Sequence, residues 1–436
     1  MKKTPFPAEI VDKIVAESGI KEVGKASIRE VKRLINDIEK ATGEEFVRME
    51  MGIPGLPPCR VGVAAQIEAL TKGVAAIYPD IEGIPDLKKE AARFVKNFID
   101  LEVKPENCIP TVGSMMGGMA GFMTFVRCRK ERDTTLFIDP GFPVQKQQHR
   151  VLGLKYETFD VYEFRGPKLR AKLESYLEKG NVHTIMYSNP NNPSWICFTE
   201  EELQIIGDVA NKYDVFVFED LAYFGMDFRQ NISAPGMPPY QPSVGKYTDN
   251  YALLISGSKA FSYAGERIAL MVMSDNLYNR EFPDLEPYFK MTKLGRAIIY
   301  GTVYAISSGV SHSAQYAMAA ILKACNDGTY NYIEDVREYG QKAEIMKKIF
   351  TDNGFVIVYD KDGDRPLADG FYFTVAYPGM SSDELLREFL YYGVSAISLS
   401  TCGSERTEGL RACVSLTPRS QFPVLEERLR LFRQNH

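Results

Sequence analysis

Apolar positions along this chain follow two patterns, short continuous runs and helical spacing, which alternate through its middle part. Apolar runs with the length of buried strands cover residues 136–139, 184–188, 215–219, 251–255 and 268–273. Polar or helical segments separate them, and the segment 200–212 begins at a capping box formed by Thr199 and Glu202. Strands that alternate with helices predict an α/β fold, with a mostly parallel mixed sheet and helices on both faces.

Two further regions flank this middle part. In residues 10–42, apolar residues recur three and four apart, which predicts one or two amphipathic helices before the Gly- and Pro-rich segment 49–58. From about residue 321, a long charged helix is followed by shorter helices and by strands expected at 355–359, 370–376, 394–399 and 410–416. We therefore expect an N-terminal arm (1–60) that packs on a small C-terminal α+β domain (321–436), and a large domain between them (61–320).

The composition narrows the class of protein. The chain has 436 residues, of which 45% are hydrophobic, and its formal net charge of -5 gives no basic field for nucleic acid or an anionic membrane. The seven cysteines include no CxxC pair, which favours reduced thiols over disulfides, and we expect no metal site. The first residues lack the apolar segment of a signal peptide, and no run reaches the ~20 apolar residues of a membrane span. These features predict a cytoplasmic enzyme.

Lys259 is the first candidate for chemistry. It lies in the segment Ser256-Gly-Ser258-Lys259-Ala, directly after the apolar run 251–255, and Arg267 follows closely. A lysine amine among small hydroxylated residues, near a guanidinium, is suited to form an imine beside a phosphate group. Pyridoxal 5′-phosphate is therefore the first cofactor to consider, although Lys259 taken alone is more simply a solvated loop lysine.

Other polar residues also follow the predicted strands. Asp220 and Tyr223 come after the run 215–219, where ligands bind in open α/β sheets, and a carboxylate there could keep a pyridine nitrogen protonated. Asn192 belongs to Ser-Asn-Pro-Asn-Asn-Pro (188–193), in which the prolines restrict the backbone and aim the amide side chains. A capping aspartate, a buried tyrosine and an ordinary turn are the structural alternatives.

Three more segments fit the same kind of site. Gly113, in Thr-Val-Gly-Ser-Met-Met-Gly, allows the backbone to approach a phosphate at the N-terminus of an apolar helix. Phe142, in Asp-Pro-Gly-Phe-Pro, could stack on a pyridine ring or belong to the core. Arg411 lies between apolar residues in an expected strand and needs a carboxylate partner, because an unpaired buried charge is costly. That partner could be a structural Asp or Glu, or a substrate.

Taken in order, from about Met51 to Arg411, these segments resemble the aspartate aminotransferase superfamily, the fold-type I or class I/II pyridoxal-phosphate enzymes. The resemblance implies that Lys259 is the Schiff-base lysine and that Asp220 pairs with the pyridine nitrogen, so these two residues and Tyr223 are the expected catalytic residues. The other residues implied to bind the cofactor are Tyr78, Gly113, Ser114, Met115, Phe142, Asn192, Ser256, Ser258 and Arg267. Tyr78 would reach the phosphate from a neighbouring subunit, which implies a homodimer. Gly52, Asn192 and Arg411 would bind the substrate.

The resemblance also implies an activity, the ping-pong transfer of an amino group from an L-amino acid to a 2-oxo acid. Dicarboxylate-specific members carry an arginine in a segment that looks like residues 297–305, where Tyr300 or a neighbour stands here and Arg296 lies a few residues early. We therefore expect a neutral or aromatic amino donor. Ser194-Trp195 replaces the small pair that usually follows Asn-Pro in the family. Trp195 lines the pocket, closes a loop or packs away from the site.

Alternatives differ in how well they fit. A cystathionine β-lyase-like C–S lyase would use the same cofactor and scaffold, and no motif separates it from a transaminase. A ligand-sensing transcription factor would need a DNA-reading domain, and residues 10–42 are too short and too weakly basic for a winged helix. A dinucleotide-binding Rossmann protein would need G-x-G-x-x-G between an early strand and a helix, which we do not find.

Overall fold

The strands of the large sheet are arranged in the order β1-β7-β6-β5-β4-β2-β3 in the computed structural model, which describes residues 4–436. Their bounds are β1 Cys108–Val112, β2 Thr134–Asp139, β3 Lys155–Asp160, β4 Val182–Ser188, β5 Phe216–Leu221, β6 Tyr251–Ser256 and β7 Ile268–Met273. β7 is antiparallel to both of its neighbours, and the remaining pairs are parallel. The mostly parallel mixed sheet predicted from the apolar runs is confirmed.

Each predicted run lies within or closely overlaps an observed strand. Two strands of the large sheet, β1 and β3, were not predicted, and each has a feature that hides it in the sequence. β3 lies at an edge of the sheet, and its first four residues are only partly buried, so it carries no continuous apolar run. β1 is buried but contains Pro110 in the middle of its five residues. An edge position suits this residue, because proline cannot donate a ladder hydrogen bond.

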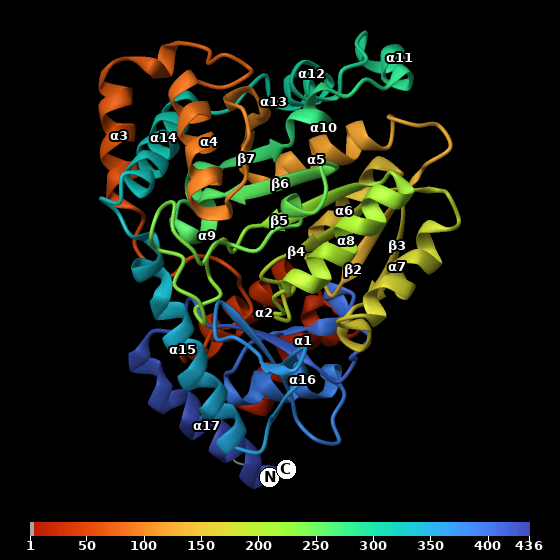
Figure 1. Cartoon of the computed structure of the whole chain (residues 1–436). Coiled ribbons are helices and arrows are strands. Elements are labelled where there is room, and N and C mark those ends of the chain that lie inside the picture. The colour runs from red at the N-terminus through yellow and green to blue at the C-terminus, as the bar shows by residue number, and fades with distance from the viewer. Residues whose placement is uncertain (1–3) are drawn as a thin grey trace.

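Helices flank the sheet on both sides (Figure 1). They include α3 Arg60–Thr71, α4 Pro85–Ile99, α5 Gly113–Phe125, α6 Pro143–Leu152, α7 Lys168–Leu177, α8 Glu200–Tyr213 and α14 His312–Asn326. α8 begins at the predicted capping box, in which the Thr199 hydroxyl accepts a hydrogen bond from the Glu202 amide at 3.2 Å. α5 packs on the sheet through rings, with Phe125 at 4.9 Å from Phe216 and 5.5 Å from Phe218. Such aromatic contacts anchor the helix that begins at Gly113.

The ends of several strands meet at one edge of the large sheet. β1, β2, β4, β5 and β6 all run in the same direction, so their carboxyl ends lie together. β7 runs the other way, and its first residue, Ile268, pairs with Val112 at the end of β1. Segments that follow β1, β2, β4, β5 and β6, and the residue that precedes β7, therefore converge on this edge. Most of the predicted site residues belong to these segments.

A second, four-stranded antiparallel sheet lies below the large sheet in Figure 1 and has the order β12-β13-β11-β8. Its strands are β8 Val356–Ile357, β11 Tyr372–Ala376, β12 Ile397–Ser398 and β13 Leu410–Cys413, and around it lie α1 Ala8–Ser18, α2 Ile28–Thr42, α15 Tyr332–Asp352, α16 Ser382–Tyr392 and α17 Phe422–Asn435. Rings of α15, α16 and α17 fill its core, where Phe350 and Phe432 lie 6.4 Å and 5.6 Å from Phe389. The N-terminal segment joins this part through a bridge between Val47 and Val394.

Within residues 4–436, none of the helices combines the length and the apolar character that a bilayer crossing requires.

Candidate active site

Lys259 lies in the short helix α9 (Gly257–Ala260), which directly follows β6. Its side chain is partly exposed, its amine donates a hydrogen bond to the carbonyl of Gly52, and its Nζ lies 5.3 Å from the ring centre of Phe371. Within residues 4–436 no carboxylate forms an ion pair with it. Removal from water lowers the pKa of Lys259 to about 8, and the positive charges of Arg411 and Arg267 act in the same direction. An appreciable fraction of this amine is therefore uncharged, and nucleophilic, near neutral pH.

Asp220 lies inside β5, one residue beyond the predicted end of the strand, and is 5% exposed. One of its oxygens accepts a hydrogen bond from Gln145 Nε2 at 2.9 Å, and the other accepts one from the Ala222 amide at 3.1 Å. Burial raises the pKa of Asp220 to about 6, and these two hydrogen bonds only partly oppose the rise. No cation within the described residues pairs with it, so Asp220 could hold a positively charged group of a ligand.

Arg411, in β13, is 1% exposed, and the structure tests one of the two partners considered for it, a structural Asp or Glu. Its Nη1 donates to Asn192 Oδ1 at 3.3 Å and its Nη2 donates to the Glu50 carbonyl at 2.7 Å. Its Nε has no hydrogen-bond partner among residues 4–436. Among residues 4–436 no structural Asp or Glu forms an ion pair with this guanidinium. A buried cation compensated only by neutral oxygens is therefore available for the carboxylate of a ligand.

Tyr223 follows β5 and is 4% exposed. Its hydroxyl lies 2.8 Å from the hydroxyl of Tyr372, and the Tyr372 ring lies 4.6 Å from Arg411 Cζ. Trp195 packs edge-on against Tyr223, with ring centres 5.3 Å apart, and is completely buried. Of the two places considered for Trp195, it occupies the one behind Tyr223, where it supports the ring from within the core.

The start of α5, which follows β1, lies beside Arg267, which directly precedes β7, and both offer hydrogen-bond donors. No side chain among residues 4–436 caps α5, so the backbone N–H groups of its first turn, which includes Ser114 and Met115, are not used by a cap. Gly113 has a left-handed φ of 64°, and a Cβ there would overlap the guanidinium of Arg267. Arg267 is exposed, and within residues 4–436 its guanidinium makes a single hydrogen bond, from Nη1 to the Ala264 carbonyl at 2.7 Å. This arrangement of backbone amides beside a free guanidinium can hold a phosphate.

The remaining predicted residues are placed as follows. Ser256 Oγ accepts a hydrogen bond from the Ser258 amide at 3.1 Å, which folds this loop tightly before Lys259. Phe142 is partly exposed and stands immediately before α6. Tyr78 is 89% exposed, and within residues 4–436 no hydrogen bond or ring contact joins its side chain to the other predicted residues.

Tyr300 lies in a π-helical turn (Ala297–Val303), where its hydroxyl donates to Glu82. Its ring centre is 5.2 Å from Cζ of the exposed Arg296. The segment expected to carry an arginine in dicarboxylate-specific members therefore holds an aromatic side chain here, with the nearby guanidinium over its ring.

Three contributors were not found by reading the sequence. Gln145 supplies the side-chain donor to Asp220, Phe371 lies beneath the Lys259 amine, and Tyr372 links Tyr223 with Arg411. Tyr372 stands among apolar residues at the start of β11 and looks like core in the sequence. Its period-two relation to Thr374, which pairs with Arg411 across the strands, was the only signal that could have placed it on the same face.

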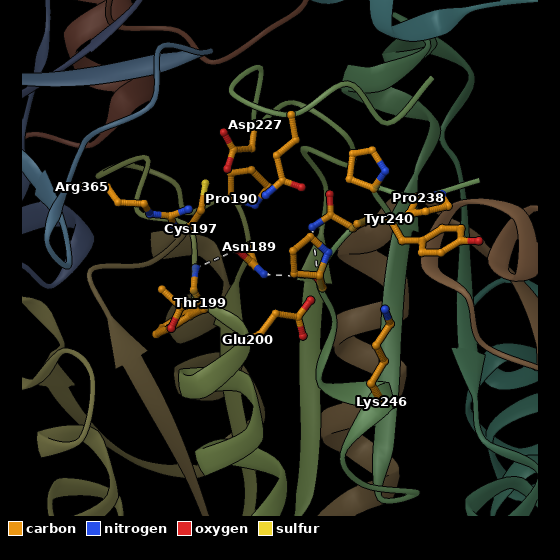
Figure 2. A pocket seen from close by; sticks show the side chains of 15 residues that line it. Asn189, Pro190, Cys197, Thr199, Glu200, Asp227, Pro238, Tyr240, Lys246 and Arg365 are labelled. Carbon is orange, nitrogen blue, oxygen red and sulfur yellow. Dashed lines mark hydrogen bonds between the residues drawn. The ribbon is translucent and has the colours of Figure 1, made fainter. Parts of the chain in front are cut away.

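A pocket of about 320 Å³ lies elsewhere in the structure and is shown in Figure 2. Its walls include Asn189 and Pro190 after β4, Glu200 of α8, and Pro238 and Lys246 of the segment before β6. Asn189 Oδ1 accepts a hydrogen bond from the Phe198 amide at 3.2 Å and so ties the loop after β4 to the start of α8. None of the predicted site residues lines this pocket, which is therefore separate from the group around Lys259.

Comparison with known proteins agrees with this geometry. Residues 44–429 match the family model described as aminotransferase class I and II. The chain is 23% identical over 348 residues to an aspartate aminotransferase of Pyrococcus horikoshii, covering 78% of each chain. It is 30% identical over 193 residues to an LL-diaminopimelate aminotransferase of Halothermothrix orenii, covering 43% of this chain and 48% of that one. The structure resembles an alanine aminotransferase from Pyrococcus furiosus with a TM-score of 0.76 at 20% identity, covering 95% and 98% of the two chains.

Proposed function

Because the chain belongs to the aminotransferase class I and II family, we propose that it uses pyridoxal 5′-phosphate, held on Lys259, to move an amino group from an L-amino acid to a 2-oxo acid. One observation carries the proposal. An amine with its pKa lowered to about 8 lies close to a fully buried guanidinium that has no carboxylate partner among the described residues. The first group suits covalent attachment of an aldehyde, and the second suits recognition of an α-carboxylate.

The residues present fit the cofactor. Asp220, which has no cationic partner within residues 4–436, would pair with the protonated ring nitrogen, and Phe142 would stack on the ring. Tyr223 and Asn192 would donate hydrogen bonds to the ring oxygen. The phosphate would be held by backbone and side-chain donors of Gly113, Ser114, Met115, Ser256, Ser258 and Arg267. When bound, pyridoxal phosphate supplies an electron-accepting ring that stabilises negative charge at the substrate Cα.

The chain's own residues divide the work of the reaction. Arg411 binds the substrate carboxylate, because its buried guanidinium has no anionic partner among residues 4–436 and its Nε is still free to donate a hydrogen bond. Lys259 would be the base that accepts the proton from the substrate Cα and the acid that returns it, and the cofactor would supply the ring that stabilises the negative charge in between. Its lowered pKa keeps part of the amine uncharged and able to accept that proton near neutral pH. The two substrates use the same Arg411 in turn, which predicts ping-pong kinetics.

The side chain of the amino donor is proposed to be neutral or aromatic. Tyr300 stands in the segment expected to carry an arginine in dicarboxylate-specific members, and Arg296 lies over its ring. A second carboxylate would therefore meet no dedicated guanidinium from this segment. The relatives named above act on different amino acids, according to their names, so they do not choose among donors.

We also propose that the protein is a homodimer in which Tyr78 reaches the phosphate of the partner's site. Tyr78 is 89% exposed, and the neighbouring Ile67, Leu70 and Ile77 are 60%, 47% and 58% exposed. Apolar side chains gathered in this way on a surface are typical of an interface. Measuring the mass in solution, and the cofactor affinity of Tyr78→Phe, tests this assignment.

The decisive experiment follows the covalent link. Wild type, Lys259→Ala and Lys342→Met would be incubated with pyridoxal phosphate, reduced with borohydride and mapped by mass spectrometry. Lys342 is the matched control, because burial also lowers its pKa to about 8 and its amine also donates to a backbone carbonyl, that of Ser415 at 3.0 Å, whereas it is not among the predicted site residues. Labelling at position 259, lost in Lys259→Ala and kept in Lys342→Met, is expected. Absence of label at position 259 in wild type would refute the proposal.

The same preparation identifies the reaction. After labelling is established, candidate amino acids would be added without any oxo-acid acceptor. Pyridoxamine phosphate together with the 2-oxo acid of the donor is expected from transamination. Pyruvate and ammonia, formed catalytically in the absence of an acceptor, would instead show a C–S β-lyase.

A further inference from the structure

Tyr372 is a buried residue that contacts three parts of the proposed site. It is 2% exposed and begins β11. Its hydroxyl lies 2.8 Å from the Tyr223 hydroxyl, and its ring lies 4.6 Å from Arg411 Cζ. Gly52, whose carbonyl accepts the Lys259 hydrogen bond, approaches so closely that a Cβ on it would overlap the Tyr372 hydroxyl. One side chain thus meets the carboxylate-binding arginine, the ring-binding tyrosine and the backbone that holds the lysine.

The pairing of two hydroxyls leaves one proton uncommitted. Burial raises the pKa of Tyr223 and of Tyr372, so both carry their protons at neutral pH. Each hydroxyl has one proton to donate, and one of the two protons lies between the oxygens. If Tyr372 is the donor, the Tyr223 proton is free to point at a ligand. If Tyr223 is the donor, its proton is used within the protein.

The Asn192 side chain is also oriented by a contact within the protein. Its Oδ1 accepts from Arg411 Nη1 at 3.3 Å, so the oxygen end of the amide is committed to the protein. Its Nδ2, a donor, is thereby turned the other way. Arg411 therefore sets the direction of the Asn192 Nδ2 donor. Tyr372 is placed to set the direction of the Tyr223 hydroxyl in the same way.

We propose that Tyr372 is a positioning residue that donates its hydroxyl proton to Tyr223 and so directs the Tyr223 proton at the ring oxygen of the cofactor. The assignment rests on the proposed function, because it presumes a ring oxygen in front of Tyr223 and Asn192. The aromatic ring of Tyr372 has a second and separable task, which is to support the Arg411 guanidinium from one side.

The test is a spectroscopic titration of the cofactor bound to Lys259, followed by its absorbance against pH without substrate. Wild type, Tyr372→Phe, Tyr223→Phe and the double variant would be compared. Loss of a well-directed hydrogen bond to the ring oxygen raises the titration midpoint, by roughly 0.5–1 pH unit for Tyr372→Phe and by more for Tyr223→Phe. Because Tyr372 acts through Tyr223, the double variant is expected to match Tyr223→Phe alone.

Additive shifts in the double variant, or an unshifted midpoint in Tyr372→Phe, would overturn the inference. Tyr372→Met also removes the hydroxyl and carries the same expectation, should Tyr372→Phe fail to fold. Tyr392→Phe is the matched control. It removes the hydroxyl of another buried tyrosine, which accepts from Asn435 Nδ2 at 2.8 Å beside α17, and it should leave the midpoint unchanged.

A second readout separates the hydroxyl from the ring. Binding of an unreactive carboxylate to the cofactor-free protein would be measured by calorimetry. Tyr372→Phe keeps the ring and should keep the affinity within about twofold, whereas Tyr372→Leu should weaken binding about three- to thirty-fold. An equal loss in both variants would contradict the division of tasks. If wild type itself takes up no cofactor, the proposed function fails as well, whereas uptake with additive shifts overturns this inference alone.

Discussion

Asp362 and Arg411 are two buried charges in the C-terminal part of the chain, and their surroundings differ completely. Asp362 is 0% exposed, and its two oxygens meet Arg165 Nη2 at 2.9 Å and Arg229 Nη2 at 2.7 Å. Arg365 approaches it at 3.3 Å as well. Arg411 is 1% exposed, and within residues 4–436 it meets neutral oxygens and an aromatic ring but no carboxylate.

The difference separates structure from function. A buried charge that is fully paired joins segments, and Asp362 joins the hairpin after β8 to the segments around Arg165 and Arg229. A buried charge without its counter-ion costs stability, and such a charge is a candidate for completion by a ligand. The comparison therefore predicts opposite consequences for removing each charge.

The largest effect is expected at Arg411. Arg411→Met should lower kcat/KM for amino acids by about 10²- to 10³-fold, because the substrate carboxylate loses a buried cation. The free energy of unfolding of the cofactor-free protein should stay the same or rise, since no charge partner is left behind. Steady-state kinetics and urea unfolding measure the two quantities. Arg406→Met, which removes an arginine paired with Glu163, is the control, and a destabilised but active Arg411→Met would break the comparison.

Removing the charge of Asp362 should have the opposite effects, a loss of stability with little change in activity. Asp362→Asn leaves the surrounding guanidinium groups with less negative charge, and the free energy of unfolding should fall by about 3 kcal/mol. Turnover per folded molecule should change less than twofold, because Asp362 contacts none of the residues around Lys259. Asp364→Asn, an exposed position in the same hairpin, should change neither quantity. Loss of activity in folded Asp362→Asn would show that the paired cluster also serves the site.

Asp220 extends the comparison to a buried anion without a cation. Burial raises its pKa from an ordinary 3.8 to about 6, so the folded protein holds a proton between about pH 4 and pH 6 that the unfolded chain has released. This carboxyl therefore lowers the stability of the cofactor-free protein as pH rises through that window, by up to about 3 kcal/mol.

Asp220→Asn should remove the share of the pH dependence that Asp220 contributes, which urea unfolding at pH 4, 5, 6 and 7 would show. The share of Glu219 and Asp139, whose pKa values burial raises to about 7, should remain. Saturating pyridoxal phosphate should also remove the Asp220 share from wild type, because a protonated ring nitrogen supplies the missing positive charge. Identical pH profiles of the cofactor-free wild type and variant would contradict the assignment of Asp220 as the uncompensated group.

The sequence predicted the parts of the site that depend on strand ends, and missed those that depend on distant pairing. Lys259, Asp220 and Asn192 were found because an apolar run precedes each of them, and parallel strands bring their carboxyl ends together. Tyr372 was missed because its partner Tyr223 lies 149 positions away and its neighbours are apolar. The partner of Arg411 could not be decided either, because it depends on which carboxylates the fold brings near β13. The structure answers one half of that question, because no Asp or Glu among residues 4–436 forms an ion pair with Arg411.

Trp195 offers the smallest and sharpest test, because its buried Nε1 also lacks a hydrogen-bond partner in the described part of the chain. If every unpartnered buried polar atom awaited a ligand, Trp195→Phe would damage binding. The indole instead lies fully buried behind Tyr223, against Gly370, where a Cβ would overlap it. We expect Trp195→Phe to lower the free energy of unfolding by about 1–2 kcal/mol, since lost packing is partly offset by removal of the unpaired N–H, and to change kcat/KM less than fivefold. Unfolding followed by circular dichroism, together with steady-state kinetics, checks both. A tenfold or greater loss of kcat/KM with unchanged stability would place the indole against the substrate, and would show that missing partners mark a ligand site for neutral groups as well as for charges.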